Sequence, residues 1–191
     1  MKKLMIMAFI ATSAVMSHAA TVSWTMTNVY GPDGNLNSGS AYIFGYQSDS
    51  GISSSMIASA LQDAFKNSGL SGVGSILSGK YKWSPSSAGS YSNTSKSVDP
   101  VGDFGLKADQ SYNFYAIIFD SDTLSSDSKF FVTKELLNKK IPEGSSNLLL
   151  AFGNQSAASQ AAGAWQAIPE PTSGLMILLG MAGLALRRKG A

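Results

Sequence analysis

The sequence predicts a mainly β fold: an antiparallel β-sandwich or open barrel with one packed amphipathic helix, an N-terminal signal peptide and a short C-terminal transmembrane helix. Two observations predict the β domain. Short segments alternate apolar and polar residues, and glycine, asparagine and aspartate punctuate the gaps between them. Only one segment has helical periodicity. With 191 residues, the chain has room for one ordinary domain plus accessory segments.

The expected strands follow in chain order. In the first, Val22, Trp24 and Met26 alternate with threonine and serine. Residues 111–120 are apolar on both faces through their second half, which is typical of a central strand. Further strands are expected at 40–48, 80–83, 129–134, 147–153 and 164–167. Turns are expected at Pro32-Asp33-Gly34, Asn37-Ser38-Gly39 and Asp99-Pro100.

One helix is expected from about Ser54 to Asn67, because Ile57, Leu61, Ala64 and Phe65 fall on one helical stripe. Serines precede the stripe as candidate caps, and Gly69 suits its end. Residues 133–138 fit either a second short helix or a continuation of the preceding strand.

The first 19 residues have the pattern of a secretory signal peptide. Lys2 and Lys3 precede an apolar run that is too short for a permanent membrane span. Small residues follow, and signal peptidase is expected to cut between Ala19 and Ala20 after export through the translocon.

Composition excludes several chemistries. The chain has no cysteine, and its only histidine, His18, lies in the expected signal peptide. The mature protein then has no Ser-His-Asp or Cys-His nucleophile and no usual zinc or copper ligand set. Residues 20–168 carry nine lysines, no arginine and eleven acids, a net charge of about −2. Such a surface is unsuited to nucleic acid, which needs clustered basic residues.

Three weak candidate sites remain. Ser126-Asp127-Ser128-Lys129 matches the Ser-x-x-Lys spacing of a lysine-activated serine, without that class's companion motifs. A pair among Asp120, Asp122 and Asp127 could hydrolyse a glycosidic bond if a cleft held it, but these residues also suit a turn. Those aspartates, or Asp33 with Asn35 and Asn37, could bind calcium, although the second loop departs from the EF-hand pattern. We therefore predict no catalytic, cofactor or metal site.

The end of the sequence has three parts. Pro169-Glu170-Pro171 cannot continue a helix and favours an exposed extended segment. Residues 172–186 are uncharged and mainly apolar, and as a helix they reach about 22 Å, a marginal membrane span. Arg187, Arg188 and Lys189 follow and are expected to keep this end in the cytoplasm.

Motif, span and basic cluster together resemble the PEP-CTERM sorting signal of Gram-negative bacteria, over residues 167–189. The resemblance implies processing near the motif by an exosortase, a membrane enzyme with a cysteine nucleophile. It also implies transient anchoring in the inner membrane before release or attachment at the cell surface, often in bacteria that make exopolysaccharide. An ordinary single-pass anchor is the alternative.

These observations divide the chain into a signal peptide (1–19), a β-rich extracytoplasmic domain (20–166) and a sorting signal (167–191). We expect a non-enzymatic structural or interaction protein of the cell envelope or extracellular matrix. The alternative is a glycan-binding module for exopolysaccharide, using sugar-stacking aromatic rings; less favoured is a carboxylate-based glycoside hydrolase. The candidate stacking residues are Trp24, Tyr42, Tyr46, Tyr81 and Trp83.

Overall fold

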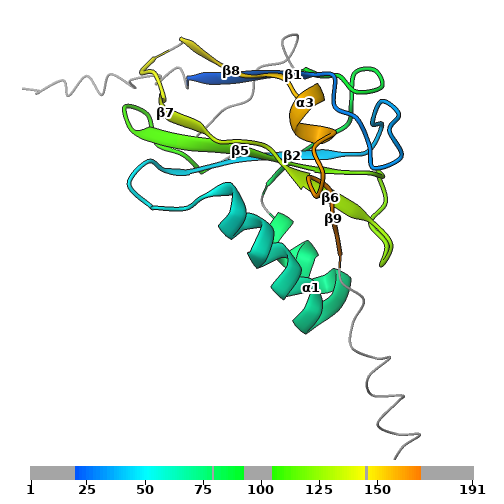
Figure 1. Cartoon of the computed structure of the whole chain (residues 1–191). Helices are drawn as coiled ribbons and strands as arrows, with labels where there is room; N and C mark the ends of the chain where they lie inside the picture. The colour runs from blue at the N-terminus through cyan, green and yellow to red at the C-terminus, as the bar shows by residue number, and fades with distance from the viewer. Residues whose placement is uncertain (1–19, 79, 93–104, 145, 169–191) are drawn as a thin grey trace, which may run out of the picture.

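The computed structural model describes residues 20–78, 80–92, 105–144 and 146–168. The expected signal peptide, the turn at Asp99-Pro100 and everything from Pro169 onward lie outside these residues. The described residues form two β-sheets and few helices, arranged as three layers with the longer helix beneath the larger sheet (Figure 1). This arrangement fits the predicted β-sandwich.

The smaller sheet has the strand order β4–β1–β8, with β4 at Tyr91–Ser92, β1 at Thr21–Thr27 and β8 at Asn147–Asn154. β1 and β4 are antiparallel, but β1 and β8 are parallel, with Val22 opposite Leu148. The expectation of purely antiparallel pairing is therefore wrong here. These two strands lie at opposite ends of the domain sequence, so no tight hairpin imposes antiparallel pairing.

The larger sheet has the order β3–β2–β5–β6–β9, and all its neighbours are antiparallel. β5 is central: β2 lies along one edge, while β7 and β6 share the other. The bounds are β2 Ala41–Gln47, β3 Tyr81–Trp83, β5 Ser111–Phe119, β6 Lys129–Val132, β7 Leu136–Lys140 and β9 Gln166–Ala167.

The two faces of β5 explain its apolar sequence. Phe114, Ala116 and Ile118 face the first core, which lies between the two sheets and includes Trp24. Tyr115, Ile117 and Phe119 belong to the second core, which α1 (Ser54–Leu77) covers from the other side. Residues 112–119 are all buried because β5 has a packed layer on each face, as its sequence predicts.

The first half of α1 matches the predicted helix. Ser53 caps its start, since the Ser53 hydroxyl accepts a hydrogen bond from the Met56 amide at 3.3 Å. Ile57, Leu61 and Phe65, spaced four residues apart, are buried against the sheet.

The second half of α1 is not predicted by the sequence analysis. Gly69 has non-helical torsions with a φ of 60°, a left-handed value that glycine adopts at little cost, and it bends the helix sharply. The chain then continues to Leu77, with Gly72 in close contact with the Ala64 carbonyl of the first half. A side chain at position 72 would collide with that carbonyl.

Residues 133–138 form no helix, so that alternative is wrong. β7 begins at Leu136 and pairs with the first half of β5, with Ser111 opposite Lys140. A left-handed Asn138 (φ 50°) and a register irregularity interrupt the pairing, which explains why the segment lacks a clean strand periodicity. A four-residue helix, α3 (Ser156–Ser159), completes the described elements.

Candidate functional site

The last described residues belong to the folded domain. β9 pairs with β6, and Ala167 lies opposite Lys129. The Ile168 amide then donates a hydrogen bond to the Ser128 carbonyl at 3.2 Å. The Ile168 side chain is only 4% exposed and belongs to the second core, beneath the larger sheet.

The Pro-Glu-Pro motif therefore follows the core directly. Pro169 is the next residue after a buried isoleucine, so no spacer separates the motif from the domain.

Comparison with known proteins identifies this same region. The model of the PEP-CTERM protein-sorting motif matches residues 167–189, a limited segment of the chain. The chain thus carries a PEP-CTERM sorting motif, which implies an exported protein that an exosortase processes for sorting to the cell surface. No curated protein and no solved structure matches the chain. Within the described ranges, no helix has the length and apolar character needed to cross a membrane.

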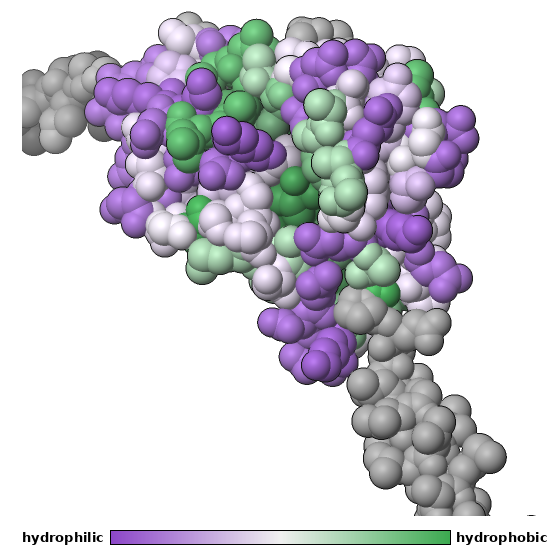
Figure 2. All heavy atoms as spheres, in the orientation of Figure 1, coloured by the Kyte–Doolittle hydropathy of each residue, from purple (hydrophilic) through white to green (hydrophobic). Residues whose placement is uncertain are grey.

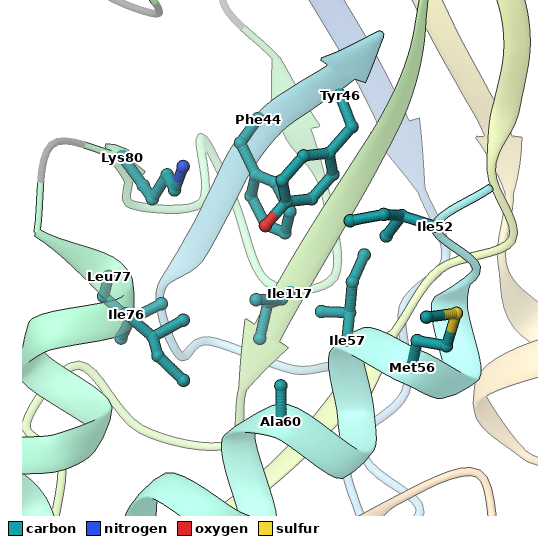
Figure 3. A pocket seen from close by; sticks show the side chains of 10 residues that line it. All are labelled: Phe44, Tyr46, Ile52, Met56, Ile57, Ala60, Ile76, Leu77, Lys80 and Ile117. Carbon is teal, nitrogen blue, oxygen red and sulfur yellow. The ribbon is translucent and has the colours of Figure 1, made fainter. Parts of the chain in front are cut away.

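A second candidate site is an apolar cavity between α1 and the larger sheet, with a volume of about 190 Å³ (Figure 3). Ile117 of β5 lies between the helix halves in this view, with Ile57 from the first half and Leu77 from the second. The bend at Gly69 is what brings both halves of α1 to one cavity.

Polar groups occur at one side of this cavity. The Lys80 ammonium lies 5.4 Å from the ring centre of Phe44 and 5.7 Å from that of Tyr46. Tyr46 in turn packs against Tyr115, whose hydroxyl donates a hydrogen bond to the Ile52 carbonyl. Burial, with the nearby Glu135 charge, raises the pKa of Tyr115, so this hydroxyl stays neutral near pH 7.

Of the candidate sugar-stacking aromatics, the structure describes the side chains of Trp24, Tyr42, Tyr46 and Trp83, and it does not gather these four on one open face. The Tyr81 side chain lies outside the described part of the chain. Trp24 is fully buried between the sheets and contacts Trp83 edge-to-face, with ring centres 5.0 Å apart. Tyr42 and Tyr46 are half-buried on the opposite, helix-covered face, each meeting a phenylalanine edge-on. The stacking hypothesis is wrong for Trp24, because its alternation reflects core packing.

The aspartates after β5 take part in local structure. The Asp122 carboxylate accepts a hydrogen bond from the Ser40 hydroxyl at 2.7 Å, and its carbonyl accepts one from Lys82. Asp127 is exposed in the loop before β6. No cluster of three or more acidic, histidine or cysteine side chains suited to a metal occurs in the described part of the chain. These contacts favour the interpretation of the aspartates as turn residues.

The second candidate calcium loop divides into two structural roles. Asp33 accepts hydrogen bonds from the Asn35 amide and side chain, which lower the pKa of Asp33 and close a tight turn. Asn37 is instead buried and donates to the Tyr91 hydroxyl and the Phe119 carbonyl. Asn37 therefore holds the two sheets together, a role that its sequence context does not reveal.

The Ser-x-x-Lys match has no supporting geometry. Ser126 is exposed and shares no hydrogen bond with Lys129. Lys129 begins β6 rather than a helix, in agreement with the sequence analysis. Ser128 is buried, and its hydroxyl accepts from the Ser125 amide to stabilise the loop.

Figure 2 shows the character of the surface in the orientation of Figure 1. Hydrophilic residues cover much of this face, and hydrophobic residues occur as separate patches rather than as one continuous surface. The hydrophobic patches in this view do not merge into one docking surface.

Proposed function

We propose that the chain is a non-enzymatic structural or interaction protein of the cell envelope or extracellular matrix. An exosortase cuts the chain near Pro169-Glu170-Pro171 and releases the folded domain. The cavity beside α1 supports a binding role over catalysis, because its lining holds no pair of carboxylates and no nucleophile with a base.

The observation that carries this proposal is the position of Ile168. Its amide is hydrogen-bonded to the Ser128 carbonyl, just before β6, and its side chain is buried, so the described part of the domain extends to the residue before the motif. Cleavage after Ile168 leaves both sheets and both cores whole. The apolar run 172–186 and the basic cluster then serve only to hold the chain in the inner membrane until the cut.

Fractionation of cells with and without their exosortase tests the proposal, with an antibody against the folded domain as the probe. Wild-type protein should leave the inner membrane only when the exosortase is present. Glu170→Ala should lose its signal peptide normally yet accumulate uncleaved in the membrane. Glu143→Ala, which removes an exposed acid from the domain, is the matched control and should behave as wild type. An identical distribution of wild-type and Glu170→Ala protein in both hosts would make the tail an ordinary anchor.

Deleting residues 187–189 separates the roles of span and motif. Each basic residue costs roughly 2.5–3.5 kcal/mol to move to the centre of a membrane helix, so the deletion should weaken the membrane stop. We expect this variant to lose its cytoplasmic C-terminal orientation while keeping an intact motif.

A further inference from the structure

The apolar cavity beside α1 has the features of a ligand site, and sorting makes no use of it. Much of its wall is aliphatic: Ile57 and Ile76 come from the two halves of α1, and Ile117 comes from β5. Small-molecule sites are concave and mostly apolar, with a few converging polar groups that orient the ligand.

Of the polar groups at this cavity, the charged one is the Lys80 ammonium. Lys80 lies just before β3, and its side chain points toward the Phe44 and Tyr46 rings (Figure 3). No acidic side chain lines the cavity. Within the described ranges, the ion pair that forms joins Lys140 to Asp109, so Lys80 has no carboxylate partner there. A partly buried cation beside an apolar cavity is complementary to a ligand with one anionic end and one apolar end.

The cavity's size restricts the apolar end. A dry cavity of about 150 Å³ accepts a benzene ring. At about 190 Å³, this cavity has room for slightly more, roughly six or seven carbons of an alkyl chain, with a head group outside it. We propose that it binds a medium-chain fatty acid, with the acyl chain along Ile57, Ile76 and Ile117 and the carboxylate at Lys80.

The chain's own apolar run is a less suitable occupant. Residues 172–186 begin four positions after Ile168, but they contain no acidic residue and would leave Lys80 without an anion. A fatty acid satisfies both the apolar wall and the cation. Photo-crosslinking distinguishes the two occupants.

Photo-crosslinking of the full chain tests the proposal independently of exosortase. The probe is an octanoate analogue with a diazirine in its chain, and mass spectrometry maps the adducts. Labelling should fall in α1, and octanoate should compete for it. Each methylene added between butanoate and octanoate should lower the competing concentration about fourfold, as burial of a methylene predicts.

Two variants examine the two ends of the ligand. Lys80→Gln should raise the octanoate concentration needed for competition about two- to fivefold, the range for a partly exposed ion pair, and leave competition by octan-1-ol unchanged. Lys82→Gln is its control, since Lys82 contacts the Asp122 carbonyl outside the cavity. Ala60→Leu fills the cavity and should abolish labelling of α1. Ser59→Leu, exposed and outside the lining, should not.

Three results would overturn the proposal. The first is labelling confined to residues 172–186. The second is equal competition by octanoate and octan-1-ol in the wild type, which would remove the role of Lys80. The third is an α1 that is labelled only in a chain ending at Ile168, which would identify residues 172–186 as the occupant. If Ala60→Leu fails to fold, the Lys80→Gln and chain-length series still decide.

Discussion

Replacing Tyr91 with phenylalanine tests how the two sheets are joined. The Tyr91 hydroxyl, on β4 of the smaller sheet, donates a hydrogen bond to the Gly39 carbonyl at 2.7 Å. It also accepts one from the Asn37 side-chain amide at 2.8 Å, and that amide bonds the Phe119 carbonyl at the end of β5. Tyr91 itself is fully buried. The substitution therefore removes two buried hydrogen bonds without changing the shape of the ring.

The expected cost follows from these two bonds. A neutral buried hydrogen bond contributes about 1 kcal/mol, and a buried acceptor left without a donor costs about 1–3 kcal/mol. Asn37 keeps its bond to Phe119, so the Gly39 carbonyl is the main orphan. We expect Tyr91→Phe to lower the free energy of unfolding by about 2 kcal/mol.

Urea unfolding at pH 7 measures this change, as a fall of about 1 M in the midpoint with an unchanged slope. Burial raises the pKa of Tyr91 above its ordinary value of 10.0. Its contribution should be complete below pH 10 and should decline as the pH rises toward the folded pKa, so the gap between wild type and variant narrows there. Tyr30→Phe is the control, because the Tyr30 hydroxyl makes no hydrogen bond to the described residues. If Tyr91→Phe lowers the free energy of unfolding by less than about 0.5 kcal/mol, as the control does, these hydrogen bonds do not hold the two sheets together.

Three further predictions concern other parts of the domain. Gly39→Ala should cost more than about 3 kcal/mol in urea unfolding, because a Cβ there would overlap backbone atoms of Phe119 and Ser121 that cannot move aside; wild-type stability would contradict this packing. The Ser54 hydroxyl bonds the Glu135 carboxylate at 2.7 Å and lowers the pKa of Glu135. The same hydroxyl also lies 2.8 Å from the Thr133 carbonyl, as a second acceptor. Ser54→Ala should therefore cost about 1 kcal/mol at pH 7, and the part due to Glu135 should be lost as the pH falls below 4.5 through the lower folded pKa, while a pH-independent loss would assign the whole cost to the Thr133 contact. Circular dichroism of the domain should be unchanged by EDTA, and a large drop in melting temperature would show that an aspartate loop binds a metal.

Periodicity predicts most of the larger sheet. A strand buried on both faces must be apolar throughout, so the sequence of β5 alone indicates its central position. The first half of α1 is equally clear, because Ile57, Leu61 and Phe65 repeat at helical spacing.

Pairing between distant segments is not visible in the sequence. The parallel contact of β1 with β8 depends on which core each strand covers, and periodicity carries no information on strand direction. The second half of α1 is hidden by Gly69, Gly72 and Gly74, which look like a loop but allow the helix to bend back closely. The two-residue strand β4 is too short to show a pattern.

The two candidate sites also differ in how far the sequence predicts them. The sorting motif is predictable because its three parts are continuous in sequence, and the matched region coincides with the predicted one. The cavity is not predictable from the sequence, because its lining comes from parts of the chain that are distant in sequence. These are β2, the two halves of α1, the residue before β3, and β5, which contribute Phe44, Ile57, Ile76, Lys80 and Ile117. The alternating pattern around Trp24 fits a sugar-stacking face as well as a core. Only the packing of the larger sheet against Trp24 shows that this residue belongs to the core.

The intact mass of the protein released from the cell tests the central claim most directly, namely that processing leaves a domain that is complete at Ile168. We expect a chain that starts at Ala20, ends at Ile168 or within the next few residues, and lacks the apolar run 172–186. This mass should be absent from cells without the exosortase. A released chain that ends before Gln166 would lack β9 and the buried Ile168, and it would contradict the account. So would a released chain that still carries residues 172–186.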